Sequence, residues 1–173
     1  MQAQEQRAKV MMLIDFENLL RNIELTPPEH FSLMDGFDRL IRQISQEVGE
    51  IVNVLVFAPS HLATAWAEDL HRLGFFTILC PRITNKEGEQ EDTTDAMIME
   101  FGRKTIHHHN ITHLCLCSGD KDFGPFLRDV IRQGLKIVIA AGNLTSLSNE
   151  LIRLADKKKT GEKMVYILSP TRE

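Results

Sequence analysis

Short apolar runs alternate with segments of helical periodicity along almost the whole chain. The apolar runs predict strands over residues 9–14, 51–58, 75–80, 112–117, 136–141 and 164–168. The periodic segments predict helices over residues 19–23, 35–48, 60–73, 92–106, 123–133 and 146–155. This alternation is typical of right-handed βαβ units, which place helices on both faces of a parallel sheet. We expect an α/β three-layer sandwich with a mostly parallel sheet of five to six strands, the last strand at an edge.

The segments outside this alternation are polar. Residues 1–8 predict a flexible tail, residues 81–91 predict a mobile loop, and residues 9–173 are expected to form one domain. No apolar run is long enough to span a membrane, and no signal peptide is visible. The three cysteines lie in apolar runs without a CxxC pair, which favours a reducing compartment. We therefore expect a cytoplasmic protein that makes no membrane contact.

The net charge of −4 gives the chain no overall attraction to nucleic acid. Any contact with phosphate must then come from a local group of basic side chains. Arg82 and Lys86, in the predicted loop after the third strand, lie at the edge of the sheet where the carboxyl ends of the strands meet. These two residues are candidate phosphate contacts.

Acidic residues gather at the predicted carboxyl edge of the sheet, where open α/β sheets bind their ligands. Asp15 ends the first strand, while Asp120 and Asp122 follow the fourth. Asp95 lies in the first turn of the helix before the fourth strand, which begins at the same edge. Asn18 follows Asp15 by about one helical turn and can face the same side. The sequence thus predicts one cluster of four carboxylates and one amide, provided that the first and fourth strands are neighbours.

Such a cluster of carboxylates favours a bound cation. Two carboxylates about 4 Å apart repel each other by roughly 4 kcal/mol at an effective dielectric constant near 20. Oxygen ligands select Mg²⁺ or Mn²⁺ over zinc, and a metal-polarised water can attack a phosphodiester. Each acidic residue also has a simpler explanation, because Asp15, Asp120 or Asp122 could cap a helix and Asp95 could complement a helix dipole. Their joint position at one edge favours the metal site.

The motifs that carry these residues resemble the NYN domain of the PIN-like nuclease superfamily, in its LabA-like branch. The matching segments are Leu-Ile-Asp-Phe-Glu-Asn at 13–18, the helix that contains Asp95, Ser-Gly-Asp-Lys-Asp-Phe at 118–123 with Pro125 and Leu127, and residues 134–142 and 148–156. The resemblance covers nearly the whole chain in the right order. It implies a PIN-like fold and a metal-dependent ribonuclease.

The resemblance also assigns roles to individual residues. It implies an acidic site of Asp15, Asp95, Asp120 and Asp122 that holds Mg²⁺ or Mn²⁺, with Asn18 and Ser118 orienting a ligand carboxylate or the water. RNA would be the substrate, and a homodimer is possible.

One position departs from the family pattern. Asp92 stands where the family has a Lys, so an anion replaces a cation near the scissile phosphate. Asp92 could be an additional ligand, or the substitution could weaken the site. Lys86 and Lys121 are candidates to supply the missing positive charge.

Three functions remain open at this point. The first is an RNase that cuts by metal-activated water attack and leaves a 5′-phosphate. The second is a non-catalytic RNA- or protein-binding regulator on the same fold, which the Asp92 departure keeps open. The third is an aspartyl-phosphate phosphatase with Asp15 as nucleophile, against which the G-D-x-D spacing counts. A P-loop kinase and a Rossmann oxidoreductase are disfavoured, because neither glycine motif occurs.

Overall fold

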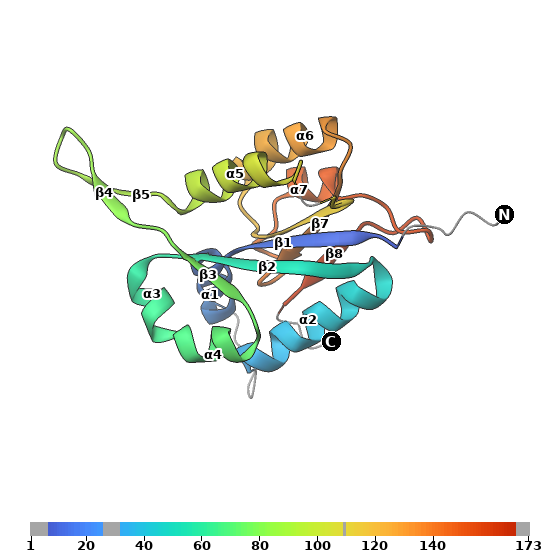
Figure 1. The fold of residues 1–173 in the computed structure, drawn as a ribbon, viewed down its shortest axis with the longest axis horizontal. Coiled ribbons are helices and arrows are strands. Elements are labelled where there is room, and N and C mark those ends of the chain that lie inside the picture. The colour runs from blue at the N-terminus through green and yellow to red at the C-terminus, as the bar shows by residue number, and fades with distance from the viewer. Residues whose placement is uncertain (1–6, 26–31, 109, 169–173) are drawn as a thin grey trace.

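A six-stranded parallel sheet forms the centre of the computed structural model, which describes residues 7–25, 32–108 and 110–168 (Figure 1). The strands are β1 (Lys9–Asp15), β2 (Glu50–Ala58), β3 (Phe76–Leu79), β6 (His113–Cys117), β7 (Lys136–Ala141) and β8 (Val165–Ile167). Their order in the sheet is β3-β2-β1-β6-β7-β8. The predicted α/β class and parallel sheet are confirmed, with β8 at an edge. The predicted tail at residues 1–8 lies mostly outside the described residues.

Helices cover both faces of the sheet, as the sandwich prediction requires (Figure 1). On one face lie α1 (Phe16–Leu25), α2 (Leu33–Glu47), α3 (Ser60–Ala65) and α4 (Ala67–Arg72). On the other lie α5 (Thr94–Thr105), α6 (Gly124–Arg132) and α7 (Asn149–Leu154). A short 3₁₀ segment, η1 (Lys121–Phe123), leads into α6. None of the helices in the described part of the chain is long and apolar enough to cross a membrane.

The central strand β1 supplies both cores, because successive side chains of a strand point to opposite faces. Met12 and Ile14 pack with the helices of one face, while Met11 and Leu13 pack with the helices of the other. All four side chains are fully buried. The three cysteines, Cys80, Cys115 and Cys117, are also buried and free. The near-continuous apolar run of β1 is therefore explained by burial on both sides.

The segment at 81–91 corrects the loop prediction. It forms an antiparallel hairpin of β4 (Arg82–Thr84) and β5 (Gln90–Asp92), which extends away from the sheet (Figure 1). The turn is organised by Asn85, whose side-chain oxygen accepts hydrogen bonds from the backbone N–H groups of Glu87 and Glu89. Every residue of the two strands is exposed, so the sequence carries no alternation of apolar and polar residues that would reveal them.

Two helix predictions also change. The helix predicted over 60–73 is divided into α3 and α4 at Trp66, whose backbone leaves helical geometry (φ −107°, ψ 8°). The Trp66 ring packs edge-to-face on Phe16, with 6.0 Å between ring centroids. The helix predicted to begin near residue 19 starts at Phe16, directly after β1. The first helix therefore leaves the sheet without a connecting loop, which holds its first turn close to Asp15.

The order of the strands defines where a ligand site is expected. The chain adds β2 and β3 on one side of β1, and then places β6, β7 and β8 on the other side. The direction of winding reverses between β1 and β6, which pair in parallel with Ile14 opposite Cys117. A crevice forms at such a switch point, outside the carboxyl ends of the strands. Asp15 and Ser118 lie at these two strand ends.

Candidate active site

A polar cavity of about 190 Å³ opens at the carboxyl ends of β1 and β6. Its lining combines five carboxylates, an amide, a hydroxyl and one guanidinium. The lining residues are Asp15, Glu17, Asn18, Arg21, Asp92, Thr94, Asp95 and Asp120. Five residues singled out from the sequence are among them, namely Asp15, Asn18, Asp92, Asp95 and Asp120. The structure therefore brings together residues from β1, the start of α5 and the segment after β6.

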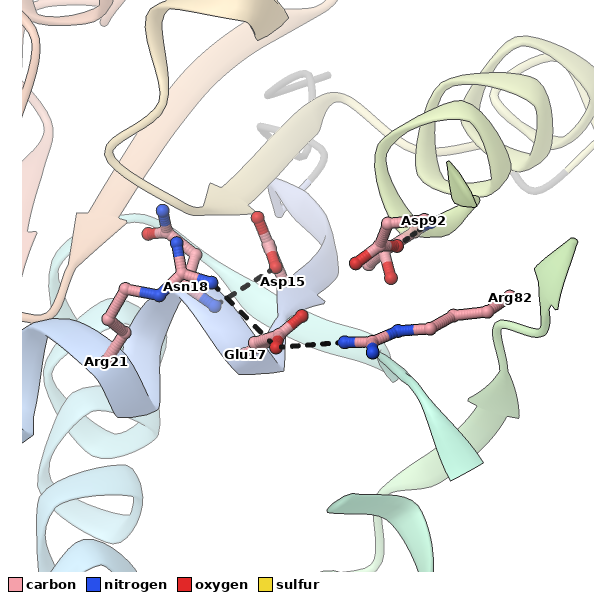
Figure 2. A network of polar contacts seen from close by, with 7 residues as sticks. Asp15, Glu17, Asn18, Arg21, Arg82 and Asp92 are labelled. Carbon is pink, nitrogen blue, oxygen red and sulfur yellow. Dashed lines mark hydrogen bonds and ion pairs between the residues drawn. The ribbon is translucent and has the colours of Figure 1, made fainter. Parts of the chain in front are cut away.

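Asp15 lies at the bottom of this cavity and is only 5% exposed. One carboxylate oxygen accepts a hydrogen bond from the backbone N–H of Asn18 at 3.3 Å (Figure 2). The other accepts one from the Ser118 hydroxyl at 3.2 Å. Burial raises the pKa of Asp15 to about 7, helped by the charges of Asp95 and Asp120 and opposed by the two hydrogen bonds. The carboxylate is therefore poised to exchange a proton for a cation near neutral pH.

Hydrogen bonds join the segment after β6 to the first turn of α1. The Asn18 side-chain oxygen accepts a hydrogen bond from the backbone N–H of Gly119 at 3.2 Å. The buried Ser118 hydroxyl, besides donating to Asp15, accepts one from the backbone N–H of Asp120 at 3.3 Å. Asp120 in turn accepts one from the N–H of Asp122 at 2.9 Å and so caps η1. The orientation of Asp120 thus follows from the same contacts that fix Asp15.

Asp95 reaches the cavity from the first turn of α5. Burial raises its pKa to about 6, and the charges of Asp120, Asp92 and Asp122 add to this effect. A helix N-terminus attracts anions, yet here burial, with the carboxylate neighbours adding to it, outweighs that attraction. Asp95 and Asp15 both show the electrostatic cost expected when several carboxylates share a small volume.

Asp92 ends the hairpin, and its pKa is lowered, unlike those of Asp15 and Asp95. Burial alone would raise its pKa, but the backbone N–H of Thr94, which donates to its carboxylate at 2.8 Å, and the nearby charge of Arg82 together lower it. Asp92 is therefore an ionised residue at the start of α5, facing Arg82 across the hairpin (Figure 2). It contributes negative charge to the cavity where a cation was expected from the resemblance.

The buried hydroxyl of Thr94 lacks a hydrogen bond of normal length and angle within the described part of the chain, although it lies close enough to Asp92 to help lower the pKa of that carboxyl. Thr94 is 3% exposed and lines the cavity, and its Oγ1 makes no hydrogen bond of normal length and angle to any described residue. A buried hydroxyl without a partner costs about 1–3 kcal/mol, so a ligand or an ordered water is expected beside it. The donor set of carboxylate, amide and hydroxyl oxygens suits a hard divalent cation.

The carboxylates do not by themselves close around an ion. Within residues 7–25, 32–108 and 110–168, no group of three or more His, Cys, Asp or Glu side chains is close enough together to hold a metal. An ion bound here would therefore have to retain several waters, as Mg²⁺ does in proteins.

The remaining residues named from the sequence lie outside the cavity lining. Asp122 is exposed, although its charge contributes to the raised pKa of Asp95. Lys121 is exposed at the start of η1, and Lys86 lies in the turn at the hairpin tip. Arg82 lies at the base of the hairpin, where its guanidinium is 3.9 Å from the Glu17 carboxylate.

Sequence reasoning did not assign a role in the site to Glu17, Arg21 or Thr94. Glu17 and Arg21 are four residues apart and form an ion pair at 3.8 Å on α1. Their spacing, immediately after the strand-end Asp15, is the signal that could have identified them. Thr94 is preceded by no comparable signal, because a threonine at a helix start is common.

Gly119 permits the close approach of two segments at this site. A Cβ at Gly119 would lie 2.2 Å from the backbone oxygen of Ser146, and the Gly119 carbonyl accepts a hydrogen bond from the N–H of Ser148. We expect Gly119→Ala to lower the free energy of unfolding by about 2 kcal/mol, because backbone cannot move aside as a flexible side chain does. Urea denaturation measures the change.

Gly88→Ala is the matched control for that substitution. Gly88 lies in the hairpin turn with φ +84°, and a Cβ at this position would meet no atom within 4 Å, so only the left-handed backbone opposes the change. Its cost is expected to be about 1 kcal/mol. If Gly119→Ala were as stable as the wild type, the close approach at Ser146 would be disproved.

The chain is similar to one known family and to one protein of known structure. The family model described as the NYN domain matches residues 9–160. A crystal structure of a protein of unknown function from Vibrio parahaemolyticus RIMD 2210633 is similar to this chain at 19% identity and a TM-score of 0.72, over 96% of this chain and 95% of that one. At this identity the likeness concerns the fold alone. No curated protein matches the chain.

Proposed function

The chain belongs to the NYN domain family, and from this premise we propose that it is a Mg²⁺- or Mn²⁺-dependent endoribonuclease. The observation that carries the proposal is the meeting of Asp15, Asp95 and Asp120 with the buried Thr94 hydroxyl in one cavity at the switch point of the sheet. These oxygens match the donor preference of a hard cation, and the raised pKa values of Asp15 and Asp95 indicate that positive charge is favoured there.

Each residue has a role in this proposal. Asp15, Asp95 and Asp120 would bind the ion partly through waters that it retains, because no three of the described carboxylates are close enough to hold it directly, while Ser118 and Asn18 fix the carboxylate of Asp15 and the backbone of Gly119. A bound Mg²⁺ or Mn²⁺ supplies Lewis acidity toward the phosphodiester and lowers the pKa of water. An acidic residue without direct contact to the ion would accept a proton from the attacking water. In-line attack would leave a 5′-phosphate on the product.

The exposed acidic residues take a secondary role. Asp122 does not line the cavity, so in the proposal it shapes the field around Asp95. Lys86 and Lys121 are exposed and remain candidate contacts for more distant phosphates of the RNA. We also propose a cytoplasmic location, which suits three buried free cysteines, and a homodimer stays a prediction.

Asp92 favours a second candidate function. Its ionised carboxylate adds negative charge to the cavity at the position where the family has a cation, which would repel a substrate phosphate. A protein with this change could bind RNA or a protein partner without cutting RNA. Metal binding without cleavage of either single-stranded or structured RNA would support this regulator over the nuclease.

Removal of the metal tests the proposed function. We expect cleavage of single-stranded and structured RNA in Mg²⁺ or Mn²⁺, loss of cleavage in EDTA, and recovery when Mn²⁺ is added in excess. Gel analysis of end-labelled RNA follows the cleavage and identifies the 5′-phosphate. Cleavage that continues in EDTA at an undiminished rate would contradict the proposal.

A further inference from the structure

Two arginines next to the acidic cavity share one carboxylate. Arg21 of α1 lies 3.8 Å from Glu17, and Arg82 of β4 lies 3.9 Å from the same oxygen of Glu17. Figure 2 shows the two guanidiniums reaching Glu17 from opposite sides, beside Asp15 and Asp92. Two guanidiniums face one carboxylate, so this group of three residues carries an excess positive charge beside the cavity.

The contacts to Glu17 leave the arginines able to bind something else. Both nitrogen–oxygen distances are beyond hydrogen-bond length, and the side chains of Arg21 and Arg82 are 67% and 49% exposed. Exposed ion pairs of this kind contribute only about 0–1 kcal/mol. A guanidinium has five N–H donors in a planar fork that matches two phosphate oxygens. A phosphate can therefore displace Glu17 at little cost.

The position of Arg82 is defined at the base of the hairpin. Arg82 pairs with Asp92 in the antiparallel register, and the Thr93 hydroxyl donates a hydrogen bond to the carbonyl of Pro81 next to it. Arg21 is held on α1, four residues after Glu17. The two guanidiniums thus come from opposite walls of the site, one from a helix and one from the hairpin.

We propose that Arg21 and Arg82 form a binding subsite for a backbone phosphate of the RNA, next to the phosphate that is cut. Glu17 lies between the two arginines and competes with the phosphate for their guanidiniums. The subsite rests on the proposed function, because that function makes RNA the ligand. It also explains how an acidic cavity approaches a polyanion, since the adjacent guanidiniums offset the repulsion by Asp92 and its neighbours.

Binding in the absence of cleavage tests the subsite. The dissociation constant of a fluorescent single-stranded RNA is measured by anisotropy in EDTA, at several salt concentrations, with the full chain. Arg21→Ala and Arg82→Ala are each expected to weaken binding about fivefold and to reduce the salt slope by about 1. Arg72→Ala is the matched control, because Arg72 is equally exposed in an i,i+4 pair with Glu68 on α4, and it should change neither value.

A double-mutant cycle isolates the part played by Glu17. Glu17→Gln removes the competing anion and is expected to tighten RNA binding about threefold, while Glu68→Gln has no effect. In the Arg21→Ala/Arg82→Ala background, the effect of Glu17→Gln should disappear. Inorganic phosphate is then added as a competitor. If the subsite binds a phosphate that is part of an RNA strand, displacement of the labelled RNA should need a far higher concentration of inorganic phosphate than of unlabelled RNA.

The outcomes separate the subsite from the ribonuclease. Undetectable RNA binding by the wild type, arginine variants that bind as the wild type does, or a Glu17→Gln effect that persists without the arginines would overturn the subsite. Displacement by inorganic phosphate at the same concentration as by unlabelled RNA would overturn the claim that the subsite prefers a phosphate within an RNA strand. Cleavage in Mn²⁺ is measured separately. RNA binding through the arginines without any cleavage would contradict the proposed ribonuclease activity and leave the proposed subsite standing.

Discussion

Asp120→Asn is expected to lower the rate of RNA cleavage by about a thousand-fold in saturating Mg²⁺, whereas Asp122→Asn lowers it by less than about threefold. The two residues are close in sequence and belong to the same acidic motif. Asp120 lines the cavity, while the side chain of Asp122 is exposed outside it. Comparing the two variants therefore tests whether cleavage depends on a carboxylate in the cavity, or only on acidic residues near it. Single-turnover cleavage of labelled RNA provides the rates.

The substitution at Asp120 preserves the local structure, which keeps the comparison informative. An asparagine oxygen can still accept the hydrogen bond that the N–H of Asp122 donates, so the cap of η1 remains. Thermal unfolding should give midpoints within a few degrees of the wild type for both variants. If both variants lose activity equally while remaining folded, the distinction drawn between Asp120 and Asp122 is wrong.

Stability of the metal-free protein is expected to fall as the pH rises from about 4 to 7, and Asp15→Asn should remove the larger part of this dependence, because Asp95, with a pKa of about 6, contributes the rest. Burial raises the pKa of Asp15 from 3.8 to about 7, so the folded state binds the proton more tightly than the unfolded state. The stabilisation is complete below the unfolded pKa and is lost as the pH passes through the folded pKa. That difference in pKa corresponds to about 4 kcal/mol at 1.36 kcal/mol for each pH unit.

Asp15→Asn should therefore raise the free energy of unfolding at pH 8 by about 2 kcal/mol, after allowance for its altered hydrogen bond with Ser118. Urea denaturation in EDTA at pH 5 and pH 8 measures the effect. Asp38→Asn, an exposed change on α2, serves as control and should follow the wild type. Mn²⁺ should stabilise the wild type at pH 8 and have little effect on Asp15→Asn. An equal pH dependence in the wild type and Asp15→Asn would refute this account of Asp15.

The sequence predicted the sheet and the strand-end carboxylates for a common physical reason. Strands that are buried on both faces have continuous apolar sequences, and the first polar residue after such a run marks the end of the strand. Asp15 and Ser118-Gly119-Asp120 are found by this rule alone. The pairing of β1 with β6 does not follow from these runs, because the strand order depends on packing between distant segments.

The hairpin and the contact that Arg82 makes with Glu17 were harder to predict. Each strand of the hairpin has three exposed residues, which is too short and too polar for a periodic signal. The contact between Glu17 and Arg82 joins residues that are distant in the chain, so no local spacing reveals it. Thr94 is missed for another reason, since its significance lies in the hydrogen bond of normal geometry that its buried hydroxyl lacks among the described residues.

The base of the hairpin is held to the rest of the protein, whereas its tip, residues 84–90, contacts mainly itself. Its base carries Arg82 and Asp92 and is tied by the contact between Thr93 and Pro81, whereas the turn around Asn85 is closed by its own hydrogen bonds and touches no core residue. Residues 84–90 can thus be lengthened, shortened or recoded while the acidic cavity keeps its shape. Under the proposed function, any contact that Lys86 at the tip makes with RNA is therefore encoded separately from the acidic cavity, and the tip can be varied without rebuilding that cavity.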